Sequence, residues 1–158
     1  MLKPFFDWFG TLAFSIAFRE STWMFAVIEA THLLALATFA GAVLMVDLRL
    51  MGSGLKDRPL AQVARDAQPW LFGSIIGLFV TGVPMIMGNG EKYYFSEYFW
   101  QKMVVLVVAF IYMFTIRRRI LRADEGRTAP IWRKAVGFGS LALWLFVAVW
   151  GRFIGLLS

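Results

Sequence analysis

Cysteine is absent from the 158-residue sequence, and His32 is its one histidine. The missing thiols exclude disulfides, iron–sulfur clusters and thiolate zinc sites, and one imidazole gives little support to any other zinc site. The sequence also has no Ser-His-Asp order, no glycine-rich phosphate loop and no paired-carboxylate active site. The common motifs of hydrolases and nucleotide-binding enzymes are therefore missing, and His32 is the natural starting point for any chemistry.

Charge is scarce as well, because 16% of the residues are charged whereas 59% are hydrophobic and 17% aromatic. The mean hydropathy is +0.67. A water-soluble domain of this size does not need so much apolar surface, so we predict one all-α domain, an integral membrane four-helix bundle. The expected spans cover about residues 22–50, 69–88, 97–116 and 131–156.

The first 20 residues are predicted to form an amphipathic helix that lies in the membrane interface, and a short first span is the alternative. Polar residues recur there at every fourth position, namely Lys3, Asp7, Thr11 and Ser15. This spacing draws one polar stripe along a helix. Segment 19–22 then breaks the pattern and offers hydroxyl caps for the next helix. Residues 51–68 are expected to be a polar loop with room for a short surface helix. Residues 89–97 are expected to be a short turn with aromatic membrane-interface residues at Tyr93, Tyr94 and Phe95.

The formal net charge is +6, and the basic residues gather in two connections. The loop after the first span carries Arg49, Lys56, Arg58 and Arg65, and residues 117–134 carry seven basic residues. The positive-inside rule places both connections in the cytoplasm and both termini on the outer side of a bacterial inner membrane. The same rule accounts for the basic composition, so no nucleic-acid partner is predicted.

The first span carries ionisable residues at a depth where they are costly. Glu29 lies one turn before His32, and Asp47 with Arg49 closes the helix, where we interpret the two as a cytoplasmic-end anchor. Glu29 and Asp47 are 18 residues apart, or ~27 Å along a helix. His32 is therefore expected in the outer half of the membrane, and an ionisable residue there is a functional-site hypothesis.

The predicted topology brings two cations to the same half, Lys102 from the third span and Arg152 from the fourth. Under one interpretation His32 is an axial ligand of haem b, the two cations bind its propionates, and Glu29 orients the site. Under the other, the cations snorkel to the lipid headgroups and Glu29 pairs with one of them. The sequence leaves both interpretations open.

Small residues line one face of the second span, at Gly73, Gly77, Thr81, Pro84 and Gly88. Tight helix packing explains this face, and a planar ligand pressed against it is the alternative.

A sixth iron ligand is also undecided. Candidate methionines in the outer half are Met24, Met85, Met87 and Met103, although methionine is also a common packing filler. Five-coordinate iron, or His32 of a second subunit in a homo-oligomer, are the other options. Methionine thioethers with a histidine can bind Cu(I), but the eight methionines are scattered.

Three segments resemble HemJ-type protoporphyrinogen IX oxidases and their relatives, including CopD-type membrane proteins, which are small four- or five-helix bundles. They are the helix from His32 to Leu50 with Gly41 in its interval, the TGVPMIMG segment, and Trp100 to Lys102. The motif DLRLMG, with Gly151–Arg152 near the end, is closer still to an uncharacterised group of small bacterial membrane proteins.

The resemblance to HemJ-type proteins implies that His32 is a b-type haem ligand and that Lys102 is its functional partner. The sequence departs from that pattern at Asp47, at Glu29 and in the Trp-to-Lys spacing, so the resemblance carries haem binding better than protoporphyrinogen oxidation. We therefore predict a b-type haem-binding membrane protein with a redox, electron-transfer or sensing role. The alternatives are a membrane oxidoreductase acting on a porphyrinogen or quinone, and a copper or small-solute membrane protein without haem.

Overall fold

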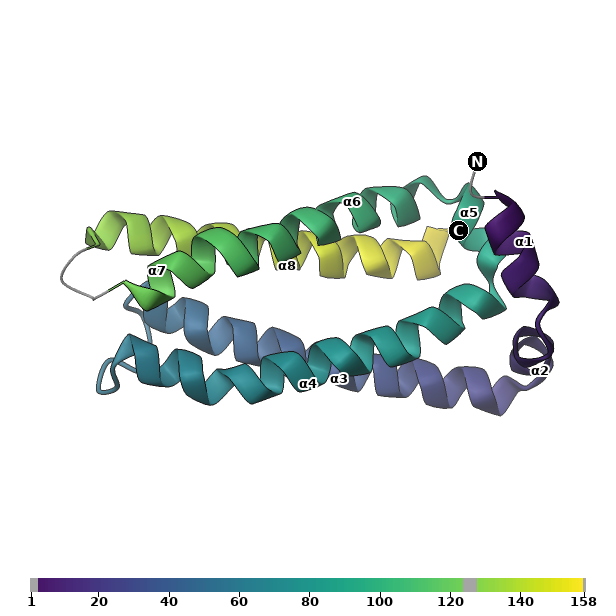
Figure 1. The fold of residues 1–158 in the computed structure, drawn as a ribbon, viewed down its shortest axis with the longest axis horizontal. Coiled ribbons are helices and arrows are strands. Elements are labelled where there is room, and N and C mark those ends of the chain that lie inside the picture. The colour runs from purple at the N-terminus through teal and green to yellow at the C-terminus, as the bar shows by residue number, and fades with distance from the viewer. Residues whose placement is uncertain (1–2, 124–127, 158) are drawn as a thin grey trace.

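The computed structural model describes residues 3–123 and 128–157, and these residues form helices and no strands. In chain order the elements are α1 (Lys3–Thr11), α2 (Ala13–Glu20), α3 (Thr22–Leu50), α4 (Leu60–Gly88), α5 (Gly90–Phe95), α6 (Glu97–Tyr112), η1 (Met113–Arg117), α7 (Arg118–Arg122) and α8 (Pro130–Leu157). Helix α3 packs along α4 and α6 packs along α8, and the two pairs meet mainly through α3 and α8 (Figure 1). The predicted all-α four-helix bundle is confirmed.

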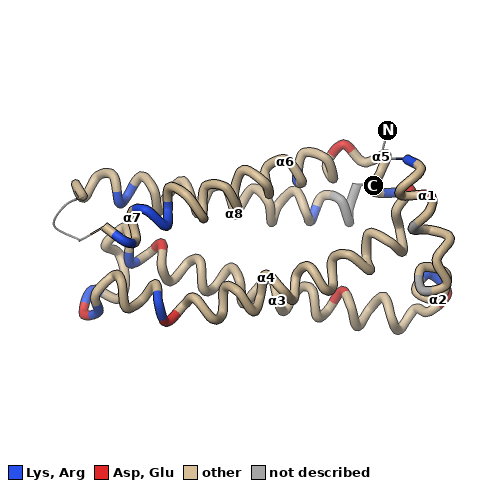
Figure 2. Tube along the Cα trace, in the orientation of Figure 1, with Lys and Arg blue, Asp and Glu red and all other residues tan. Residues whose placement is uncertain are grey.

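Four helices are long and apolar enough to cross a membrane: Thr22–Leu50, Leu60–Gly88, Glu97–Arg122 and Pro130–Phe153. The third of these runs through α6, η1 and α7 without a break. Charged positions gather at the two ends of the bundle, most of the basic ones at the end that carries α7, and the middle is almost free of them (Figure 2). This distribution is the one expected of a multipass membrane protein.

The N-terminal segment folds as two helices, where one was predicted. The backbone is extended at Leu12, between α1 and α2, and the two helices lie across one end of the bundle (Figure 1). Arg19 Nη2 donates to the carbonyl oxygen of Gly10 at 2.6 Å and so bridges the two helices. Ser15 is fully buried, so the predicted polar stripe does not lie on one exposed face.

Two connections also differ from expectation. Helix α4 begins at Leu60, nine residues before the predicted second span, because Leu60, Val63 and Ala67 bury their side chains against the bundle. The polar connection is correspondingly shorter, and the segment 89–97 contains α5. At the start of α3, Ser21 accepts a hydrogen bond from the backbone N–H of Met24 at 3.3 Å, which confirms the hydroxyl cap.

The apolar core lies in the half of the bundle near α7. One cluster joins residues of α3, α4 and η1, namely Phe39, Ala42, Val43, Val46, Val63, Ala67, Leu71 and Met113. In α3 the buried residues all lie between Phe39 and Leu50, and residues 22–38 are exposed or half-buried. Trp144 of α8 packs edge-on against Phe39, with ring centroids 4.4 Å apart, and against Phe110 of α6 at 5.5 Å. This aromatic layer lies between the half that contains this core cluster and the half that contains His32.

A buried ion pair lies within the half that contains the core cluster. Arg117 Nε donates to Asp47 Oδ1 at 2.8 Å, and the two side chains are 3% and 0% exposed. The π-helical turn η1 ends at Arg117; such a turn inserts one extra residue into a helix and re-aims the side chains around it. The interpretation of Asp47 as part of an end anchor is therefore wrong, because its carboxylate is buried against Arg117. Arg49 lies at the end of α3, where its Nε donates to the Arg58 carbonyl oxygen at 2.7 Å.

Gly88 offers a test of how α2 docks on α4. A Cβ atom at Gly88 would lie 2.2 Å from the Phe18 ring, which is 1% exposed, whereas a Cβ at Gly41 would meet nothing within 4 Å. We expect Gly88→Ala to lower the free energy of unfolding by about 1–3 kcal/mol through overpacking. Gly41→Ala should be neutral or raise it by up to ~1 kcal/mol through helix propensity. Unfolding in detergent, followed by circular dichroism, measures both, and equal values for the two variants would refute the docking.

Candidate functional site

His32 lies half-buried on α3, and its ring is fixed by α4. His32 Nδ1 is 2.7 Å from Thr81 Oγ1, and that hydroxyl donates to the carbonyl oxygen of Gly77 at 2.6 Å. A hydroxyl has a single proton. When Thr81 donates that proton to the Gly77 carbonyl oxygen, the Thr81 oxygen accepts a hydrogen bond from His32 Nδ1–H. In this arrangement the proton is on Nδ1 and the lone pair is on Nε2, which is the form of imidazole that ligates metals.

The glycines of α4 allow α3 to approach closely. A Cβ at Gly77 would lie 3.2 Å from the Cβ of Ala35, and one at Gly82 would lie 3.4 Å from His32 Cε1. Tight helix packing therefore accounts for Gly77, as one of the two predicted explanations held. Gly82 was not among the residues selected from the sequence, although it follows Thr81 directly. Its lack of a side chain leaves space for the His32 imidazole.

Lys102 reaches the same region from the other helix pair. Its side chain lies along α8, where a Cβ at Gly151 would be 3.0 Å from Lys102 Nζ. Lys102 is also close enough to His32 for the two to interact electrostatically. The bundle therefore brings together an imidazole from α3 and an ammonium group from α6. Arg152, the residue after Gly151, is exposed.

Glu29 faces α5. Its carboxylate acts on Tyr93, whose pKa is raised above the ordinary value by burial and then by the charge of Glu29. The Tyr93 ring stacks on Phe99 with centroids 5.5 Å apart. Within the part of the chain that the structure describes, Glu29 and Lys102 form no ion pair, so the predicted alternative in which these two pair is not observed. Tyr93 is a neighbour of the site that the sequence had suggested only as an interface aromatic.

The comparison with known proteins gives one result. The sequence model of a family described as "Family of unknown function (DUF6644)" matches residues 5–157. The chain belongs to the DUF6644 family. No curated protein and no solved structure matches it. The DUF6644 match spans all four long helices and includes His32, Lys102 and Arg152.

The donor set of this DUF6644 bundle limits which metals it can hold. Among the described residues, no three His, Asp or Glu side chains come together to form a metal site. The four methionines considered as sixth ligands, Met24, Met85, Met87 and Met103, are half-buried. The arrangement offers one imidazole nitrogen and a nearby cation, which suits a group that brings most of its own metal ligands and carries acidic substituents.

Proposed function

We propose that this DUF6644 protein is a b-type haem-binding integral membrane protein with a redox, electron-transfer or sensing role. The hydrogen bond between His32 and Thr81 carries the proposal, because a histidine that binds haem iron needs one ring nitrogen held by a partner and the other bearing a lone pair. A macrocycle supplies four nitrogens to its iron, so a single histidine is a sufficient protein ligand.

The residues present fit such a group. His32 Nε2 would bind the iron, and Lys102 and Arg152 would bind the propionates by charge-assisted hydrogen bonds. Thr81 holds the imidazole in one orientation and one tautomer, and Glu29 would adjust the polarity of the site from the side of α5. Residues 22–38 of α3 lack fully buried side chains, so this part of the helix has side-chain surface left for a bound group. When bound, haem would supply one-electron chemistry at its iron.

The proposed setting is a bacterial inner membrane, with the lipid bilayer as partner and no nucleic acid. The concentration of Lys and Arg at the end with α7 (Figure 2) supports placing that end in the cytoplasm. His32, Lys102 and Arg152 then lie in the outer half, together with the N-terminal helices. A second copy in a homo-oligomer would offer its own His32 as a sixth ligand.

The test is an absorption spectrum. The protein is expressed with a haem precursor, purified in detergent, and measured oxidised and reduced, with haem quantified against protein. We expect a Soret band that shifts on reduction and about one haem per chain, or one per two chains in a shared site. A purified, folded protein without a Soret band would overturn the proposal, and copper in place of iron by metal analysis would favour the copper alternative.

A second candidate is a membrane oxidoreductase acting on a porphyrinogen or quinone. One observation favours it, namely the electrostatic interaction between Lys102 and His32 from opposite helix pairs, since a cation there would bind an acidic substrate as readily as a propionate. Complementation of a strain that lacks protoporphyrinogen oxidase distinguishes this enzyme from a haem protein of another role.

A further inference from the structure

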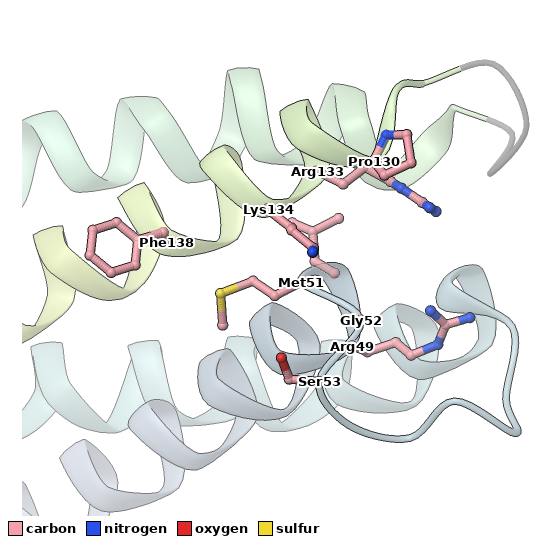
Figure 3. A pocket seen from close by; sticks show the side chains of 9 residues that line it. Arg49, Met51, Gly52, Ser53, Pro130, Arg133, Lys134 and Phe138 are labelled. Atoms are coloured by element: carbon pink, nitrogen blue, oxygen red, sulfur yellow. The ribbon is translucent and has the colours of Figure 1, made fainter.

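A cavity of about 460 Å³ opens at the end of the bundle far from His32, where α3 ends and α8 begins. Its size falls within the range of ~300–1,000 Å³ that is typical of small-molecule sites. The lining combines the cations Arg49, Arg133 and Lys134 and the hydroxyl of Ser53 with the apolar side chains of Met51 and Phe138 (Figure 3). It shares no residue with the His32 site.

The polar part of this cavity favours an anion. Three cationic side chains line it, and no acidic side chain of the described residues does. Pro130 also lines it and is the first residue of the 28-residue helix α8, so the positive end of that helix dipole adds to the field of the cations. Arg49 is held in place through the bond from its Nε to the Arg58 carbonyl oxygen.

The apolar part indicates what the anion is attached to. Phe138 lies one turn after Lys134 on α8, towards the membrane interior, and is 70% exposed. Figure 3 shows Lys134 reaching from α8 towards Met51 at the end of α3. A ligand that satisfies the whole lining has a negative head among the cations and an apolar tail that runs along Phe138. Free phosphate would satisfy only the head.

We propose that this cavity binds the phosphate headgroup of an anionic phospholipid, with the start of an acyl chain against Phe138. Basic pockets at the cytoplasmic ends of membrane helices recognise such headgroups, and the cavity lies at the end of the bundle that the positive-inside rule assigns to the cytoplasm. The proposal is independent of haem, because its residues lie at the opposite end of the helices.

Lipid titrations followed by native mass spectrometry in detergent test the site. Phosphatidylglycerol is the probe, with phosphatidylcholine and inorganic phosphate as the comparison ligands. Lys134→Gln should weaken phosphatidylglycerol binding by about tenfold or more, because it removes a charge-assisted bond to phosphate. Arg119→Gln is the matched control: it removes the same charge from an exposed position of α7, at the same end and outside the lining. This control should change binding by less than about threefold.

The apolar contact has its own pair of variants. Phe138→Ser should weaken phosphatidylglycerol binding, whereas Ile131→Ser, at a 73% exposed residue of α8 outside the lining, should not. Equal losses of phosphatidylglycerol binding in Lys134→Gln and Arg119→Gln would show that binding depends on surface charge alone, and would overturn the site. Equal affinity for phosphatidylcholine would also overturn it. Inorganic phosphate competing as strongly as phosphatidylglycerol would overturn the lipid as its ligand.

Discussion

Replacing His32 with glycine is expected to abolish the Soret band of the purified protein, and added imidazole is expected to restore it. The substitution removes the imidazole that the proposal places on the iron, and leaves beside Gly82 a space that free imidazole can enter. The helix should still form, because glycine in its interior costs about 1 kcal/mol. Haem content per chain and the visible spectrum, with and without imidazole, are the measurements.

Two further variants make this result specific. Thr31→Gly introduces the same backbone change at the exposed preceding position and should keep its haem. Thr81→Val removes the partner of His32 Nδ1 and should weaken haem affinity by roughly 10–100-fold, the usual effect of losing such a supporting bond. If His32→Gly keeps its haem, or if Thr31→Gly loses it equally, the bond from His32 to Thr81 only joins two helices and the proposed ligand is wrong.

The four-helix bundle could be predicted because each spanning helix is determined by the composition of its own segment. A bilayer requires about 20 apolar residues in a helix, and four such runs can be read directly from the chain. The division of the N-terminal segment into α1 and α2 could not be predicted in this way. The division depends on the contact between Phe18 and Gly88 and on the hydrogen bond from Arg19 to Gly10. Both contacts depend on how the helices pack against one another, which the local sequence does not determine.

The same distinction applies to the site. His32 stands out in the sequence because it is an imidazole within an apolar helix. Thr81 could not be assigned as its partner, nor Tyr93 as a neighbour of Glu29, because a residue's partner on another helix depends on the rotation and register of both helices. The pairing of Asp47 with Arg117, which are 70 positions apart, depends further on the π-helical turn before Arg117. The local pattern indicated only that Asp47 and Arg49 close the helix.

Asp47→Ala is expected to lower the free energy of unfolding by about 3–5 kcal/mol, because it leaves the buried charge of Arg117 without its partner. The matched control is Asp66→Ala, which breaks the exposed Arg58–Asp66 pair, where the atoms are 3.7 Å apart and the side chains 60% and 57% exposed. An exposed pair of this kind contributes about 0–1 kcal/mol. Unfolding in mixed micelles with increasing sodium dodecyl sulfate, followed by circular dichroism, gives both values.

The double variant Asp47→Leu with Arg117→Met tests whether apolar side chains can replace the buried ion pair. One hydrogen bond joins the two side chains, and Asp47 Oδ2 and Arg117 Nη2 are buried without a hydrogen-bond partner among the described residues. Each such atom loses its hydration on folding without full compensation. We therefore expect the double variant to recover most of the stability that Asp47→Ala loses, since apolar side chains of similar volume often replace a buried ion pair without loss. A double variant as unstable as Asp47→Ala would show instead that the charged pair is required to hold η1 and α3 in register.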